Sequence, residues 1–257
     1  MAKRTWDLVL LGGASGVGKS VAAARIAGAT GAFVVEFDDV VAAVQELTTA
    51  EQHPALHHFD GPSAPERPED AWPPERVLEL QIATAEALES AALGVVRNRL
   101  TVPVPAVVEG DYLTPAVCAR AVALGRTAGR DVRAVFLHEG DADRIAANYA
   151  AREPESGDQT GRAEVGARYS HWLADEARRY ALPVVDCRPW STLAERLDAA
   201  LDSALDSALD SAPDSAPDAA PSGTPSDAPT TSPTTAPATA PTTAATDRAG
   251  LPSRQAP

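Results

Sequence analysis

The feature that most constrains this chain is an eight-residue run near its start, Gly13-Ala14-Ser15-Gly16-Val17-Gly18-Lys19-Ser20. Four apolar residues that suit a buried parallel strand, Leu8 to Leu11, precede it, and an Ala-rich stretch typical of a helix follows it. The run matches the pattern G-x-x-x-x-G-K-[ST], which binds nucleotide phosphates when it joins a strand to a helix. The sequence therefore predicts a nucleotide-binding domain with a parallel sheet.

Each residue type in this loop has a chemical reason. Glycine reaches backbone conformations that other residues rarely adopt, so consecutive N–H groups can point at phosphate oxygens at the start of the helix. We expect Lys19 to reach the terminal phosphates of ATP and the Ser20 hydroxyl to ligate Mg²⁺. The residues expected to hold the phosphates are Gly13, Ala14, Ser15, Gly16, Val17, Gly18, Lys19 and Ser20. The alternative is an ordinary glycine-rich turn with a surface lysine, which would not require the full pattern between a strand and a helix.

The end of the chain differs in composition from the rest. From Leu201 the sequence repeats Leu-Asp-Ser-Ala and then becomes rich in Pro, Ala, Thr, Ser and Asp. Such a segment cannot bury enough apolar surface to offset its conformational entropy, so we expect residues 201–257 to form a disordered tail. Leucines at every fourth position allow the last helix to continue to about Ala212, where Pro213 ends it. Residues 1–200 have the size of a single domain.

Charge and cysteine usage exclude several classes of protein. The net charge is −14, and seven Asp and two Arg place −5 of it in the tail, which leaves −9 for the domain. An acidic domain argues against general nucleic-acid binding, which needs a basic face. Cys118 and Cys187 have no CxxC partner, so we expect reduced, buried thiols rather than a disulfide or zinc site. No apolar run reaches the length of a membrane span, and we expect a soluble, cytoplasmic protein.

Carboxylates follow the second predicted strand. Residues 32–37 are rich in β-formers and run into Asp38 and Asp39. The carboxyl ends of parallel strands form the edge where open α/β sheets bind ligands. We expect Asp38 to help hold Mg²⁺, and Asp38 or Asp39 to orient or deprotonate an acceptor hydroxyl. The alternative is that one of them caps a helix over residues 40–47.

Two longer segments follow. Residues 48–74 lack periodicity, and loops of this length are usually functional or mobile, so we expect an acceptor-binding flap here. A long helix is then predicted from Pro74, with an apolar face that includes Leu78 and Ile82 packed against the sheet.

The third predicted strand, residues 104–108, ends in Glu109-Gly110-Asp111-Tyr112. A Walker-B motif would place an Asp after four apolar residues, whereas this chain has a shorter apolar run and a Glu. The departure argues against a motor-type ATPase. Asp111 and Tyr112 are candidate acceptor-site residues, with helix capping as an equal alternative.

Arginines are concentrated in the last third of the domain. Arg144, Asn148 and Arg152 fall at helical spacing and share one face, and a polar segment with two glycines follows. Arg162 and Arg168 come next, and this arrangement is typical of a lid that closes over phosphates and neutralises their charge. The alternative for each arginine is a surface salt bridge. After the last predicted strand, the loop with Arg188 and Trp190 is placed to border an adenine ring, although Trp190 could equally anchor the core.

Taken together, these residues resemble 2-phosphoglycerate kinase and its small P-loop kinase relatives. The resemblance is carried by the Walker-A run, Asp38, Glu109-Gly110 with Pro115, the helix with Arg144, Asn148 and Arg152, and the strand Leu182-Pro183-Val184-Val185-Asp186. It implies a three-layer α/β P-loop kinase fold with a five-stranded parallel sheet in the order 2-3-1-4-5. It also implies an arginine lid and phosphoryl transfer from ATP with Mg²⁺.

The sequence thus predicts a kinase that phosphorylates a hydroxyl of a small molecule. Lys19, Asp38, Asp39 and Arg152 are the candidate catalytic residues, Ser20 and Asp38 the candidate metal ligands, and Arg144, Arg162, Arg168 and Arg188 the candidate nucleotide-binding cations. Two alternatives stay open: a nucleotide-dependent binding module with little transfer, and a kinase that modifies an antibiotic or a sugar.

Overall fold

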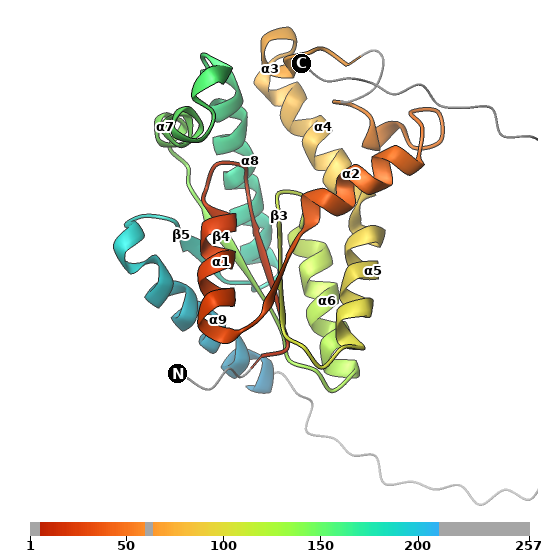
Figure 1. The fold of residues 1–257 in the computed structure, drawn as a ribbon, viewed down its shortest axis with the longest axis vertical. Coiled ribbons are helices and arrows are strands. Elements are labelled where there is room, and N and C mark those ends of the chain that lie inside the picture. The colour runs from red at the N-terminus through yellow and green to blue at the C-terminus, as the bar shows by residue number, and fades with distance from the viewer. Residues whose placement is uncertain (1–5, 60–63, 211–257) are drawn as a thin grey trace, which may run out of the picture. The chain divides into compact units, whose positions relative to one another are not determined.

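The computed structural model of this protein describes residues 6–59 and 64–210, and a parallel β-sheet runs through the middle of them (Figure 1). Its strands are β1 (Leu8–Gly13), β2 (Phe33–Glu36), β3 (Ala106–Gly110), β4 (Val132–His138) and β5 (Val184–Asp186). They lie in the order β2-β3-β1-β4-β5, and every neighbouring pair is parallel. The predicted five-stranded sheet and its strand order are therefore confirmed.

Helices cover both faces of this sheet. They are α1 (Lys19–Thr30), α2 (Phe37–Leu47), α3 (Pro68–Ala71), α4 (Pro74–Ala87), α5 (Glu89–Leu100), α6 (Pro115–Thr127), α7 (Ala142–Arg152), α8 (Thr160–Arg179) and α9 (Leu193–Asp210), with 3-10 turns η1 (Pro54–Leu56), η2 (Pro154–Ser156) and η3 (Trp190–Thr192). One face packs against α1 and α9, and the other against α6 and α8, with α5 beside α6. In Figure 1, α3, α4 and α7 extend past the end of the sheet at which the strands finish.

Strand boundaries follow burial and proline. All six residues of β1 are buried, as expected of a strand covered on both faces. β3 begins at Ala106, two residues later than predicted, because Pro105 has no N–H for the ladder. The second strand ends at Glu36 and α2 begins at Phe37, three residues before the predicted helix, because the Phe37 side chain is fully buried.

The long helix predicted from Pro74 is two helices, α4 and α5, which meet at Leu88. Leu78 and Ile82 are partly buried and pack against the main hydrophobic core, as predicted for the apolar face, whereas Val77 and Leu80 are more fully buried. Helix α4 contacts α8 and η1. Helix α5 packs on α6, and its buried residues Ala92, Leu93 and Val96 belong to the main core.

The last helix extends past residue 200. Arg133 is 2% exposed, donates from Nη1 to the Leu201 carbonyl oxygen at 2.8 Å, and pairs with Asp202, so β4 holds α9 in place. Helix is present to Asp210, close to the predicted end near Ala212. The tail that the sequence predicts to be disordered, residues 201–257, begins inside this helix. Its residues 211–257 lie outside the part of the chain that the structure describes. Within the described ranges, no helix has the length and apolar character needed to cross a membrane.

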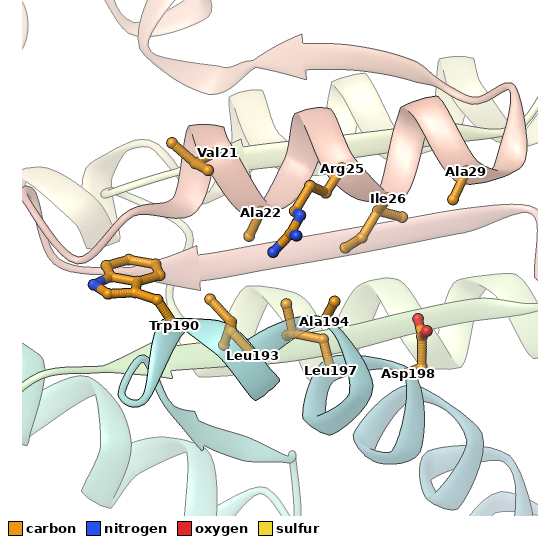
Figure 2. A pocket seen from close by; sticks show the side chains of 10 residues that line it. All are labelled: Val21, Ala22, Arg25, Ile26, Ala29, Trp190, Leu193, Ala194, Leu197 and Asp198. Atoms are coloured by element: carbon orange, nitrogen blue, oxygen red, sulfur yellow. The ribbon is translucent and has the colours of Figure 1, made fainter.

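Helices α1 and α9 lie side by side on one face of the sheet. A groove of about 70 Å³ lies between them. Figure 2 shows Ala22 and Ile26 of α1 facing Leu193 and Leu197 of α9 across it. Trp190 closes one end of this groove, next to the start of α1. The contact links the loop after β5 to the glycine-rich loop after β1.

Candidate functional site

The glycine-rich loop joins β1 to α1 in a conformation that requires glycine. Gly18 has a φ of 90°, and a Cβ there would lie 2.1 Å from the Trp190 ring. Gly13 has a φ of 149°, and a Cβ there would lie 2.8 Å from the Leu137 carbonyl oxygen. Within the described residues, no side chain caps the first turn of α1. Its N–H groups are therefore available to an anion, as the phosphate-binding pattern requires.

Lys19 is buried at the start of α1. Its Nζ donates to the Ala14 carbonyl oxygen at 3.0 Å and forms an ion pair with Asp111, which follows β3. Burial acts to lower the pKa of Lys19, but the carboxylates of Asp111, Glu109 and Asp38 outweigh it, so that the pKa is raised. Lys19 is therefore charged, and a ring of carboxylates balances its charge.

These three carboxylates come from neighbouring strand ends. Glu109 is 5% exposed and accepts a hydrogen bond from Ser20; burial raises its pKa, and the bond to Ser20 opposes that rise. Burial, and then repulsion from Asp111, raises the pKa of Asp38 to about 6. A Cβ on Gly110 would lie 2.7 Å from the Phe37 Cβ, so glycine allows β3 to approach the start of α2 closely. The close approach brings Asp38 beside Glu109 and Asp111.

The glycine-rich loop and these carboxylates line a cavity of about 660 Å³, here called the phosphate-loop cavity. Its size is within the range of small-molecule sites. Of the predicted phosphate-loop and carboxylate residues, Ser15, Gly16, Gly18, Lys19, Ser20 and Asp38 belong to its lining, whereas Gly13, Ala14, Val17 and Asp39 do not. No group of three or more His, Cys, Asp or Glu side chains in the described ranges could hold a metal ion by itself. Ser20, Asp38 and Glu109 are the oxygen-bearing side chains of this cavity that could take part in binding Mg²⁺, which usually takes one or two carboxylates and completes its shell with phosphates and water.

Two of the predicted lid arginines reach the phosphate-loop cavity. Arg152 and Arg162 line it, and both pair with Glu153, whose pKa these hydrogen bonds lower. The Arg162 guanidinium also lies 4.2 Å from the centre of the Tyr149 ring. These contacts hold two guanidinium groups at the cavity wall.

The other three predicted cations lie elsewhere. Arg144 pairs with Asp141 and Glu139, and Arg168 pairs with Glu75 and Glu164, so local carboxylates hold both outside the cavity lining. Arg188 stacks on Trp190 and donates to the Asn148 Oδ1 at 3.3 Å.

Asn148 links α7 to the glycine-rich loop. Its Nδ2 donates to the Gly16 carbonyl oxygen at 2.8 Å, while its Oδ1 accepts from Arg188. The amide therefore connects α7, the phosphate loop and the loop after β5. Trp190 lies against Gly18 and lines the phosphate-loop cavity as well as the groove between α1 and α9.

A second cavity, of about 270 Å³, adjoins the first. The two share Ser15, Asp111, Tyr112 and Arg162, and the walls of the second are completed by residues of α3, α4, α7 and α8 and by Phe59. Phe59 belongs to the segment predicted to bind an acceptor, of which residues 60–63 lie outside the described residues. This segment is held by Thr84, whose Oγ1 donates to the Ala55 carbonyl oxygen at 2.8 Å.

Two side chains at the centre of this arrangement are not among the catalytic, metal-binding or nucleotide-binding residues that the sequence predicts. Glu109 enters the prediction as a departure from the Walker-B motif and as part of the family resemblance, and Asp111 only as an acceptor-site candidate with helix capping as an equal alternative. The register of β1 with β3 places Glu109 opposite Leu11, close to the phosphate loop. The sequence does carry a signal for them: Glu109 directly follows the apolar run of residues 106–108, which pairs with the phosphate-loop strand, and Asp111 comes two residues later.

Comparison with known proteins gives a family match and several structural likenesses. A family model described as an AAA domain, AAA_33, matches residues 8–175. No curated protein matches the chain. A gluconokinase from Sinorhizobium meliloti 1021 aligns at 18% identity and a TM-score of 0.44, over 80% of this chain and 98% of that one. A shikimate kinase from Acinetobacter baumannii aligns at 11% identity and a TM-score of 0.43, over 80% and 96%. A deoxyadenosine kinase from M. mycoides aligns at 13% identity and a TM-score of 0.42, over 76% of this chain and 98% of that one.

Proposed function

This chain belongs to the AAA domain family, and on that premise we propose that it transfers the terminal phosphoryl group of ATP to a hydroxyl of a small molecule. The observation that carries the proposal is the second cavity, which opens beside the Lys19–Asp111 ion pair and shares four lining residues with the phosphate-loop cavity. A hydrolase needs only a position for water next to the phosphates. A transferase needs adjacent room for an organic acceptor, and the second cavity supplies it.

The residues present fit ATP and Mg²⁺. The glycine backbone leaves space that a Cβ would fill, and the Ser20 hydroxyl lies against the Glu109 carboxylate, with Asp38 near both. Glycine-rich loop N–H groups and Lys19 would hold the phosphates, and Ser20 with Asp38 or Glu109 would hold the metal directly or through water. When bound, ATP supplies the phosphoryl group and Mg²⁺ offsets its charge.

The chain's own groups would then position the acceptor and stabilise charge. Asp38 lines the phosphate-loop cavity and Asp39 does not, which supports Asp38 over Asp39 as the group that receives the acceptor proton. Arg152 and Arg162 would neutralise charge on the transferred group. Their present partner is Glu153, which a phosphate can replace.

The test is release of ADP from Mg-ATP by the full chain, against phosphorylated acids, sugars, nucleosides and aminoglycosides. The predicted likeness to 2-phosphoglycerate kinase makes 2-phosphoglycerate one of these acids. We expect a single acceptor to raise turnover at least tenfold with formation of one phosphorylated product per ADP, and Lys19→Ala to lower that turnover on the order of 1,000-fold. Unchanged turnover in Lys19→Ala would contradict the mechanism. ATP binding without stimulation by any acceptor would favour a nucleotide-dependent binding module.

A further inference from the structure

The second cavity is notable for the charge of its walls. Its lining combines apolar side chains, among them Phe59, Val77 and Val165, with the uncharged polar groups of Gln81 and Tyr112. Among the described residues that line it, Arg162 is the only cation, and two carboxylates, Glu69 and Asp111, oppose it.

Each charged group of this lining already has a partner. Asp111 pairs with Lys19, and Glu69 pairs with Arg67 at 3.4 Å between Oε1 and Nε. Arg162 donates from Nη1 to Glu153 Oε2 and to Gln159 Oε1, both at 2.8 Å. If Arg162 serves the phosphates of ATP, as proposed above, no lining cation is left for the acceptor. Carboxylate and phosphate ligands are usually recognised through Arg or Lys.

An anionic acceptor would therefore be disfavoured for two reasons. It would lose its hydration without gaining a charged partner, which is costly in a partly buried site. It would also have to compete with the Glu69 and Asp111 carboxylates for the cations Arg67 and Lys19, which these carboxylates already hold in ion pairs. An uncharged molecule avoids both costs, and it gains apolar contact with Phe59, Val77 and Val165.

We infer that the second cavity selects an uncharged alcohol with an apolar body and rejects acceptors that carry a carboxylate or a phosphate. The inference rests on the proposed function, because it takes this cavity to be the place where the acceptor binds with the hydroxyl that receives the phosphoryl group. The charge selectivity itself is a property of the cavity and can be measured without phosphoryl transfer.

That measurement uses the rate at which a thiol in the cavity reacts with charged and uncharged methanethiosulfonates. Val77→Cys places a thiol in the wall, while Cys118 and Cys187 are both 0% exposed and contribute little background. Leu47→Cys is the matched control, because Leu47 is 84% exposed and lies outside the lining. The reagents are methyl (uncharged), sulfonatoethyl (anionic) and trimethylammonioethyl (cationic) methanethiosulfonate.

We expect the ratio of uncharged to anionic reaction rates to be roughly tenfold higher for Val77→Cys than for Leu47→Cys. Equal ratios at the two positions would overturn the inference. If the cationic reagent reacts tenfold faster than the uncharged one with Val77→Cys but not with Leu47→Cys, the inference is overturned in favour of acceptors that carry an amino group. Val165→Cys, from the facing wall, gives a second reading if Val77→Cys fails to fold.

A second assay connects this selectivity to turnover. Three acceptors share one aromatic frame: 1-phenylethane-1,2-diol is uncharged, mandelate is anionic and 2-amino-1-phenylethanol is cationic. We expect the diol to give the highest kcat/KM for ADP release, at least tenfold above mandelate. A kcat/KM for mandelate equal to that for the diol would overturn the inference. If the thiol ratios hold and none of the three compounds nor the wider panel stimulates ADP release, the failure lies with the proposed phosphoryl transfer and not with the charge selectivity.

Discussion

The phosphate loop and the arginine helices hold their charges in opposite ways. At the phosphate loop, Lys19 is 6% exposed and pairs with Asp111, 92 positions along the chain. On α7 and α8, the Arg152 and Arg168 side chains are 54% and 40% exposed, and each has a carboxylate partner within four positions. The first region is a buried network that joins separate strands. The second is a set of local pairs at the surface.

This difference bears on how each region can act. Exposed ion pairs contribute only about 0–1 kcal/mol each, so a ligand phosphate can take over such an arginine at little cost. Breaking a buried pair costs several times more, because one charge is left without a partner. We therefore expect the phosphate loop to bind as a fixed framework, and the arginines to change partners when nucleotide binds. The predictions below test that contrast.

The largest effect is expected at the loop backbone. Gly18→Ala would place a Cβ 2.1 Å from Trp190 at a φ of 90°, so we expect a loss of about 3 kcal/mol in the free energy of unfolding and of about 1,000-fold in ADP release. Gly31→Ala is the matched control: it has a φ of 72° and nothing within 4 Å of the added Cβ, so only the strain of about 1 kcal/mol applies. Urea unfolding and ADP release measure both quantities. Equal destabilisation of the two variants would show that the loop is less rigid than described.

A smaller loss is expected when one charge leaves the buried network. Glu109→Gln keeps the shape but removes the negative charge beside Ser20 and Lys19, and we expect ADP release to fall about 100-fold with little change in Tm. Glu36→Gln is the control, because Glu36 lies opposite Glu109 on β2 but is exposed. We expect the rate of ADP release by Glu36→Gln to change less than about threefold. A similar loss in both variants would mean that the general negative field matters and not the position of Glu109.

The same contrast explains what could be predicted from the sequence. The phosphate loop was predictable because its pattern encodes local geometry: the Lys19 Nζ contacts the Ala14 carbonyl oxygen only five positions away. The sheet order followed from the family resemblance, and it is confirmed. Asp111 was harder, because its partner Lys19 lies on another strand–helix unit, and no periodicity in the sequence links the two.

The arginines show the opposite limit. Helical spacing placed Arg144 and Arg152 on one face of a helix, and α7 is indeed a helix. Spacing does not reveal which carboxylate a long side chain will meet, however, and Arg144 meets Asp141 one turn before it, while Arg152 reaches the cavity. The roles of the predicted site residues and the domain boundary near residue 200 stay predictions, which the substitutions described here address in part.

Among the arginines, the cavity lining separates Arg162 from Arg168. Arg162→Ala removes a guanidinium from the wall shared by both cavities, and we expect kcat for ADP release to fall about 30-fold. Arg168→Ala removes a surface pair with Glu75 and Glu164, and we expect a change of less than about threefold. Steady-state kinetics on both variants decide the matter. A large loss in Arg168→Ala would show that this side chain leaves its carboxylates and joins the site during turnover.

The smallest effect is a dependence of stability on pH. The pKa of Asp38 is about 6 in the folded protein against an ordinary value of 3.8, so the folded state binds an extra proton between these values. The free energy of unfolding should therefore decrease as pH rises from about 4 to about 6, and the loss is complete above that range. Asp38→Asn removes this penalty. Because the side chain keeps contact with solvent, which screens the interaction, we expect the variant to be more stable by only about 1 kcal/mol at pH 7.5 and by almost nothing near pH 4. Urea unfolding at several pH values, with Asp39→Asn as the control for loss of a neighbouring carboxylate, measures the difference. A gain that is the same at every pH would place its origin in helix α2 rather than in the burial of the Asp38 carboxylate and its repulsion from Asp111.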